Sequence, residues 1–171
     1  MLGSLQLGDA NSLQAFSLQS GSGGSLAFSA AAGSAYLVKS AGFRDMISAS
    51  IALQSPLIVS NSSGALLALN GPVTGTGTNG LTKAGSGTVT LAGTNTYSGQ
   101  TTVNAGTLLI NGRVGTNTVR VNAGGVLGGN GVVSGPVIVQ WGGVLSPGAS
   151  LGALTISNTL TLSGTTLMEL N

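Results

Sequence analysis

The sequence is short of the residue types on which most catalytic, metal-binding and nucleic-acid-binding sites depend. Its 171 residues include no cysteine, no histidine, three acidic residues and five basic residues. Without cysteine there is no disulfide framework and no thiolate metal site. The basic residues are spread thinly and only 4% of residues are aromatic, so the sequence does not favour nucleic-acid binding. We therefore expect no nucleic-acid partner, no metal and no cofactor.

Long apolar stretches are also absent. No stretch approaches about 18 uninterrupted apolar residues, so we expect no membrane insertion. Residues 1–11 lack both a basic segment and a long apolar one, so the sequence predicts no signal peptide in this chain. If the protein is exported, we expect the chain to be part of something longer. Since few charges oppose self-association, the unprotected sheet edges carry a risk of pairing between copies.

The chain is rich in glycine and in short aliphatic runs. There are 30 glycines, and 42% of the residues are hydrophobic, which is enough to bury a core. The apolar runs are short, rich in valine, leucine and threonine, and interrupted by glycine, serine, asparagine or proline. Examples are LIVS at residues 57–60 and TVTL at residues 88–91. This pattern is typical of strands and turns and predicts an all-β fold.

An internal repeat sets the expected architecture. The segments 103–112, 121–130 and 139–148 align without gaps, with an offset of 18 residues between them. The positions that recur are Val103, Val121 and Val139; Gly106, Gly124 and Gly142; and Leu109, Leu127 and Leu145. Recurrence at a fixed offset is the signature of a solenoid, in which each coil stacks on the next at the strand spacing of about 4.8 Å.

The repeat predicts a parallel β-solenoid of roughly eight coils, each about 18–22 residues long and containing two strands and two turns. The three leucines are expected to form one interior ladder, and the three glycines to mark one corner. Trp141 does not fit this scheme, since it takes the place of Ala105 and Ala123. We expect it either to face outward at a corner or to lie where the coil widens.

Residues 80–112 (GLTKAGSGTVTLAGTNTYSGQTTVNAGTLLING) resemble the autotransporter-associated β-strand repeat, also called the passenger-associated transport repeat. The resemblance lies in residues 81–83, 85–91, 95–99 and 101–108. Residues 121–148 are similar to the segment that often follows such repeats. The resemblance implies a right-handed parallel β-helix, a location outside the bacterial cell and a role as a stalk or scaffold. It carries no catalytic residues to transfer.

We therefore expect one solenoid domain over residues 1–171. Within it, residues 1–79 are expected to form irregular coils, with spacings nearer 22. Residues 80–112 form the family repeat, and residues 113–171 form regular coils and the C-terminal end.

Several short motifs suggest binding sites, but each lacks a required part. Residues 75–80 (GTGTNG) fit the dinucleotide pattern G-x-G-x-x-G, but a strand-like segment follows where a helix is needed. Residues 128–133 (GGNGVV) are similar to a calcium-binding β-roll repeat, but Val133 stands where aspartate is required. We interpret both segments as structural. Asn61-Ser62-Ser63 is formally a glycosylation acceptor, which carries little weight in a bacterial chain.

The acidic residues do not predict an enzyme. Asp9 and Asp45 are 36 residues apart, but no regular period is evident in that region, and Arg44 is adjacent to Asp45. Solvated turn positions are the favoured interpretation for both. Serine and threonine nucleophiles lack a histidine partner, and no threonine column persists from coil to coil that would favour ice binding. We expect no catalytic site.

The leading hypothesis is a structural solenoid segment, with neighbouring coils of a longer parent chain, or copies of itself, as partners. One alternative is an adhesin for carbohydrate or protein, with Tyr97 and Trp141 as candidate surface contacts and Tyr36 and Phe43 as further anchors. Another is end-to-end assembly into an extracellular filament through the apolar end at residues 165–170.

Overall fold

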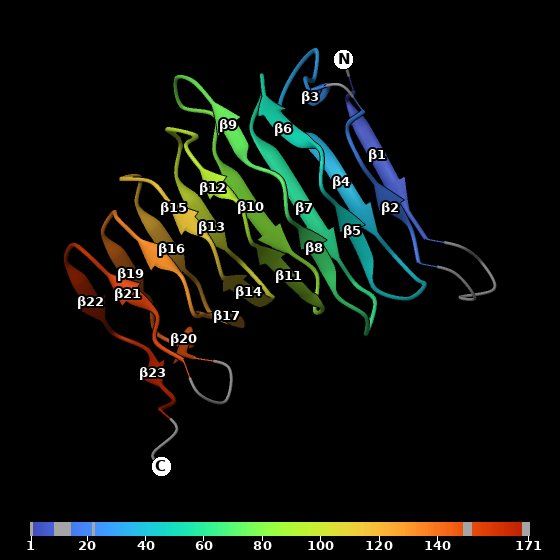
Figure 1. The fold of residues 1–171 in the computed structure, drawn as a ribbon. Coiled ribbons are helices and arrows are strands. Elements are labelled where there is room, and N and C mark those ends of the chain that lie inside the picture. The colour runs from blue at the N-terminus through green and yellow to red at the C-terminus, as the bar shows by residue number, and fades with distance from the viewer. Residues whose placement is uncertain (1, 9–14, 22, 149–151, 169–171) are drawn as a thin grey trace.

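The computed structural model describes residues 2–8, 15–21, 23–148 and 152–168, and they form a parallel β-solenoid (Figure 1). The chain coils from β1 at the N-terminal end to β23 at the C-terminal end, and equivalent strands of successive coils lie side by side. In the described ranges no element is helical, and so none is a helix long and apolar enough to cross a membrane.

Three walls enclose the core. The first wall consists of β1 (Ser4–Leu7), β4 (Ala35–Lys39), β7 (Leu57–Asn61), β10 (Leu81–Ala84), β13 (Thr101–Val103), β16 (Val119–Val121), β19 (Val137–Val139) and β22 (Leu160–Leu162). The second wall consists of β2 (Ser17–Leu18), β5 (Asp45–Ile47), β8 (Leu67–Leu69), β11 (Thr88–Leu91), β14 (Gly106–Ile110), β17 (Gly125–Gly129), β20 (Val144–Pro147) and β23 (Thr165–Thr166).

The third wall is made of two sheets in succession. The first of these contains β3 (Ser25–Phe28), β6 (Ser50–Leu53) and β9 (Val73–Gly75). The second contains β12 (Thr94–Asn95), β15 (Arg113–Val114), β18 (Val132–Val133) and β21 (Thr155–Ile156). The expectation of two strands per coil is therefore wrong. The third strand is often only two residues long, too short to show alternation in the sequence.

The number and length of the coils also differ from expectation. Seven coils have three strands and the last has two, slightly fewer complete coils than the roughly eight expected. Ser4 pairs with Tyr36, 32 residues away, and Leu57 pairs with Leu81, 24 residues away. Because longer corners at the coil surface leave the strand register intact, coil length varies more than the sequence period suggests.

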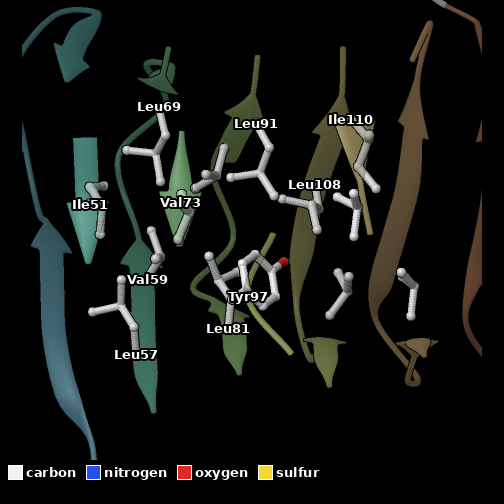
Figure 2. Packing of buried hydrophobic residues seen from close by; sticks show 14 of the residues in the cluster. Ile51, Leu57, Val59, Leu69, Val73, Leu81, Leu91, Tyr97, Leu108 and Ile110 are labelled. Carbon is white, nitrogen blue, oxygen red and sulfur yellow. The ribbon is translucent and has the colours of Figure 1, made fainter. Parts of the chain in front are cut away.

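The core is a file of aliphatic side chains that point inward from all three walls (Figure 2). In the first wall buried and half-buried residues alternate, as expected when successive side chains point to opposite faces of a strand. Leu57 and Val59 are fully buried in β7, and the next coils continue their columns. Full burial of one such side chain stabilises the fold by about 1.5–3 kcal/mol.

The 18-residue ladder is present for valine. Val103 pairs with Val121, and Val121 pairs with Val139, all three fully buried in the first wall. The glycines lie at one corner in adjoining coils. The Gly106 N–H donates to the carbonyl oxygen of Gly124 at 3.1 Å, and the Gly124 N–H donates to that of Gly142 at 2.9 Å. All three have positive φ, at 64°, 81° and 77°, which glycine adopts without strain.

The leucine ladder is shifted by one residue from the prediction. Leu109 pairs with Thr90 and Gly128 and is only half-buried. The interior column is instead Leu108, Leu127 and Leu145. The cause is the corner before the second wall, which spans residues 104–105 in one coil and 122–124 in the next. One extra residue makes the spacing 19, and a shift of one residue moves a side chain to the opposite face.

Candidate functional site

Tyr97 and Trp141, the two candidate surface contacts, have opposite environments. Trp141 lies in a turn and is 83% exposed, so it is the outward-facing corner residue that was one of the two expectations for it. Tyr97 is 2% exposed and lies in the aliphatic core (Figure 2), so the prediction of a surface contact there is wrong. It lies in a row where Asn95, Tyr97, Gly99 and Thr101 face inward, while Thr96 and Ser98 between them face outward.

The Tyr97 hydroxyl has polar partners inside the core. It forms a hydrogen bond of 2.7 Å with Thr101 Oγ1, and Asn117 Nδ2 donates to the same Thr101 oxygen at 2.9 Å. Burial raises the pKa of Tyr97 to about 12, because the phenolate would lose its hydration, although the Thr101 and Asn117 hydrogen bonds oppose the shift. This network joins the corner after β12 to the corner after β15 of the next coil.

Lys83 is fully buried, which the sequence analysis missed. Its Nζ donates to the carbonyl oxygens of Ala84 at 2.7 Å, Gly85 at 2.6 Å and Ala105 at 2.9 Å. The ammonium group therefore caps the corner carbonyls of two successive coils. Burial lowers the pKa of Lys83 to about 8, because the charged form is desolvated. The alternation in LTKA was the available signal, since it places Lys83 on the same face as Leu81.

Asn95 connects three coils with one side chain. Its Oδ1 accepts a hydrogen bond from the Val73 N–H at 3.0 Å, and its Nδ2 donates to the carbonyl oxygens of Gly93 at 2.9 Å and Arg113 at 3.0 Å. Val73 pairs with Ile51 of the preceding coil, but β9 and β12 belong to different sheets, so the ladder does not continue from Val73 to the next coil. The buried amide replaces that backbone partner where the third wall passes from one sheet to the next.

Asp45 is not the solvated turn residue that was predicted. It is 1% exposed, and its Oδ2 pairs with Lys39 Nζ at 2.6 Å. The same Nζ donates to the carbonyl oxygens of Ala41 and Phe43, and Asp45 Oδ1 accepts from the Phe16 N–H at 2.8 Å. Both charges are compensated, and the carboxylate is buried away from solvent. Asp9, its proposed companion, and Glu169 lie outside the described residues.

Asn61 closes the equivalent corner of the following coil. It is fully buried, and its Nδ2 donates to the carbonyl oxygens of Ala65 and Thr88 at 2.9 and 2.7 Å. Its Oδ1 accepts from both the backbone N–H and the hydroxyl of Ser63. The formal glycosylation acceptor is therefore enclosed in the core, where it has a structural role.

The glycine motifs take part in the walls. Residues 75–80 run from the end of β9 through a turn into β10, so a strand follows the motif where dinucleotide binding would need a helix. Residues 128–133 cover the end of β17 and all of β18. Across the described part of the chain, no group of three or more acidic, histidine or cysteine side chains could hold a metal ion.

The comparison with protein families places one known repeat in this stack. Residues 81–110 match the family model of the Passenger-associated-transport-repeat. The match begins at the first residue of β10 and ends at the last residue of β14. It therefore includes Lys83, Asn95, Tyr97 and Thr101, whose polar groups all act inside the solenoid.

The comparisons with curated proteins and with solved structures give no significant match. The repeat and the parallel solenoid together fit a structural segment of the passenger type. On this evidence, the chain carries a passenger-associated transport repeat at residues 81–110, in the middle of a parallel β-solenoid.

Proposed function

We propose that this chain is a stalk segment of the passenger region of a bacterial autotransporter-like protein, and that it extends or presents other parts of that protein outside the cell. The main support is the repeat at residues 81–110, which coincides with complete strands of the solenoid and shares its columns with the coils on both sides. A repeat of this family is associated with extracellular passengers.

The proposed mechanism is mechanical and kinetic. Each coil pairs its backbone with the previous coil and covers that coil's apolar column, so stability accumulates coil by coil. An emerging chain would add coils in order, which opposes its return through the membrane. The polar side chains at the corners form their hydrogen bonds within the core. The corners should therefore offer few flexible sites to proteases.

The proposed role does not include catalysis. Asp45 is the single acidic residue in the described ranges, and its carboxylate is buried against Lys39. Without histidine, serine and threonine hydroxyls lack the usual general base. A broad hydrolase screen should therefore return no activity, and activity lost on Asp45→Asn in a protein that remains folded would contradict this part of the proposal.

The location can be tested on intact cells that produce the full-length protein. An antibody raised against residues 23–148 should label unpermeabilised cells, and external protease should release or shorten the antigen. A periplasmic protein serves as the control for envelope integrity. Labelling that requires permeabilisation of the outer membrane would overturn the proposed surface location.

Filament formation is a second candidate, favoured by the last described coil. Leu160 and Leu162 pair with the fully buried Val137 and Val139, yet they are 39% and 47% exposed because no coil among the described residues lies beyond them. They could be covered by the next coil of a longer chain or by the first coil of a second copy. Fibres that lengthen with protein concentration, and that are absent in Leu162→Asn, would support contact with a second copy of the chain. A protein that remains monomeric at all concentrations would exclude filament formation.

The adhesin alternative is left with fewer anchors. Tyr97 is inside the core, whereas Trp141, Phe43 and Tyr36 are exposed at 83%, 53% and 44%. Loss of glycan-array or host-protein binding on Trp141→Ala would favour it.

A further inference from the structure

Four asparagines in this chain are followed directly by glycine, at residues 70–71, 79–80, 111–112 and 130–131. Asparagine is a thermolabile residue. The nitrogen of a following glycine can attack the side-chain carbonyl carbon, because glycine has no Cβ to obstruct the approach. The glycine N–H gives up its proton, a new C–N bond forms, and the side-chain nitrogen leaves as ammonia. Water then opens the resulting cyclic imide to aspartate or isoaspartate.

Three of these Asn-Gly sequences are held by the stacking of the coils. They lie in the corners between the second and third walls, and their asparagines are exposed. In each, the glycine N–H donates to a carbonyl oxygen of the preceding coil: Gly71 to Ile47 at 3.3 Å, Gly112 to Leu91 at 3.0 Å, and Gly131 to Ile110 at 2.8 Å. The glycine nitrogen must break this hydrogen bond before it can attack the asparagine side chain.

The fourth sequence, Asn79-Gly80, lacks this hydrogen bond. The Gly80 N–H has no hydrogen-bond partner in the described part of the chain, whereas its carbonyl oxygen accepts from the Leu57 N–H at 2.9 Å. Residues 76–78 before it form an exposed turn. This corner follows β9, the strand at which the first sheet of the third wall ends. Because the ladder of that sheet does not continue beyond β9, local opening should need less free energy here than in the other three corners.

The side chain of Asn79 connects this corner to the third wall. Its Nδ2 donates to the carbonyl oxygen of Leu53 in β6 at 3.3 Å, and its own carbonyl oxygen accepts from the Gly99 N–H at 3.2 Å. An aspartate carboxylate at this position has no proton to donate to Leu53. Two acceptors would then face each other, so conversion of Asn79 should release the corner from the wall.

We propose that Asn79 is a site of spontaneous hydrolytic deamidation in the folded chain, and that the fold protects Asn70, Asn111 and Asn130. The products add negative charge to a chain that has three acidic residues. Isoaspartate also adds one methylene group to the backbone just before β10. The site is independent of the stalk role, since it depends on one corner and not on the location of the protein.

The test is prolonged incubation of the folded 171-residue chain at mildly alkaline pH, followed by tryptic digestion and mass spectrometry. Replacement of the amide nitrogen by oxygen raises the mass of a peptide, and fragmentation assigns the change to one asparagine. Asn79 should convert at least about tenfold faster than Asn70, Asn111 or Asn130, because each of these must also lose a hydrogen bond to the coil below. In urea all four should convert at rates within a few-fold of one another.

Two results would overturn the proposal. Equal rates at the four sequences in the folded chain, or slower conversion of Asn79 than of any other, would show that the missing hydrogen bond does not select the site. A tenfold preference for Asn79 that persists in urea would show that the neighbouring sequence selects it, and not the fold.

Two variants test the effect of the product on the corner. Asn79→Asp reproduces one product and should lower the melting temperature by about 2–4 °C, because the bond to Leu53 is lost. Asn70→Asp, at an exposed position that also precedes glycine, is the matched control and should change the melting temperature by less than about 1 °C. Equal melting temperatures in the two variants would refute the release of the corner. None of these measurements bears on surface exposure, so the stalk proposal would fail or succeed separately.

Discussion

The corners between the first and second walls differ between the two halves of the solenoid. In the coils before residue 100, the corners at residues 40–44 and 62–66 are long, and buried polar side chains fill them. In the coils after residue 100, the corners are two to four residues long, and each contains glycine or is followed directly by it. Both halves nevertheless continue the same walls and the same core.

The difference lies in how the corner carbonyls obtain their donors. In the first half the donors come from the inward-facing side chains of Lys39, Asn61 and Lys83. In the second half the Ala105 carbonyl still accepts from Lys83, but the two corners that follow use backbone N–H groups. Gly125 donates to Asn122 and Gly143 donates to Gln140, within their own corners. Lys83 caps a corner, residues 85–87, that is short and contains glycine, so corner length alone does not decide whether a buried side chain supplies the donors.

The largest effect is expected from removing one charge of the buried pair. Asp45→Asn keeps an acceptor for the Phe16 N–H but leaves the Lys39 ammonium without a counter-charge, which should cost about 3–5 kcal/mol of unfolding free energy. Urea denaturation measures this. Arg44→Gln, at an exposed neighbouring position, should cost little.

The Lys39→Met/Asp45→Leu double variant separates the two charges from the corner itself. If unpaired charge causes the loss in Asp45→Asn, this apolar pair should recover most of the stability. No recovery, or a negligible loss in Asp45→Asn, would mean that the polar corner does not stabilise the first half as described.

The glycine corners should respond unequally to alanine. Gly106 and Gly124 both have positive φ, which costs alanine about 1–2 kcal/mol. A Cβ at Gly106 would also lie 2.5 Å from the carbonyl oxygen of Gly85, whereas at Gly124 the nearest atom is 3.8 Å away. Gly106→Ala should therefore lose at least about 1 kcal/mol more than Gly124→Ala in the same denaturation experiment. Equal losses would show that the coils can separate at this corner without cost.

The sequence predicted the second half of the solenoid better than the first. The 18-residue offset identified the valine column and the glycine corner. Where the corners are short, residues that are 18 apart in the sequence lie next to one another in successive coils. It misplaced Leu109, because one additional corner residue cannot be recognised from aligned glycines alone. Register across a corner depends on which residues bulge, and that is decided by packing.

The buried polar residues could be predicted only in part. Alternation places Lys39 and Lys83 on inward faces, but a lysine at an inward position is ordinarily taken as a sign that the face is exposed. The acceptors that make its burial tolerable, such as Ala105 for Lys83, come from a neighbouring coil about one period away in the sequence. Tyr97 was misassigned for a related reason, since the Thr101 hydroxyl that it bonds is itself held by Asn117 from the next coil.

The pH dependence of the unfolding free energy tests the capping of corner carbonyls by the buried Lys83 side chain. Its folded pKa is about 8, below the ordinary value of 10.5, so the folded state binds fewer protons than the unfolded state between these pH values. Stability should rise with pH over this window, by an amount on the order of 1–3 kcal/mol, and the gain should be lost as pH falls through 8. In Lys83→Met this rise should be absent, as denaturation at several pH values can show. The same slope in both proteins would contradict the assignment.

Tyr97 should give the smallest effect, with the opposite pH dependence. Tyr97→Phe removes one hydrogen bond to Thr101 and should cost about 1 kcal/mol at neutral pH. Since the folded pKa of about 12 exceeds the ordinary 10.0, the folded state retains its proton longer, and stability should fall as pH rises from 10 to 12. Tyr97→Phe should lose this decline, whereas Tyr36→Phe, at a 44% exposed position, should keep it. Ultraviolet titration of Tyr36→Phe reports Tyr97 alone, and ionisation near 10 would show that the ring is accessible to water.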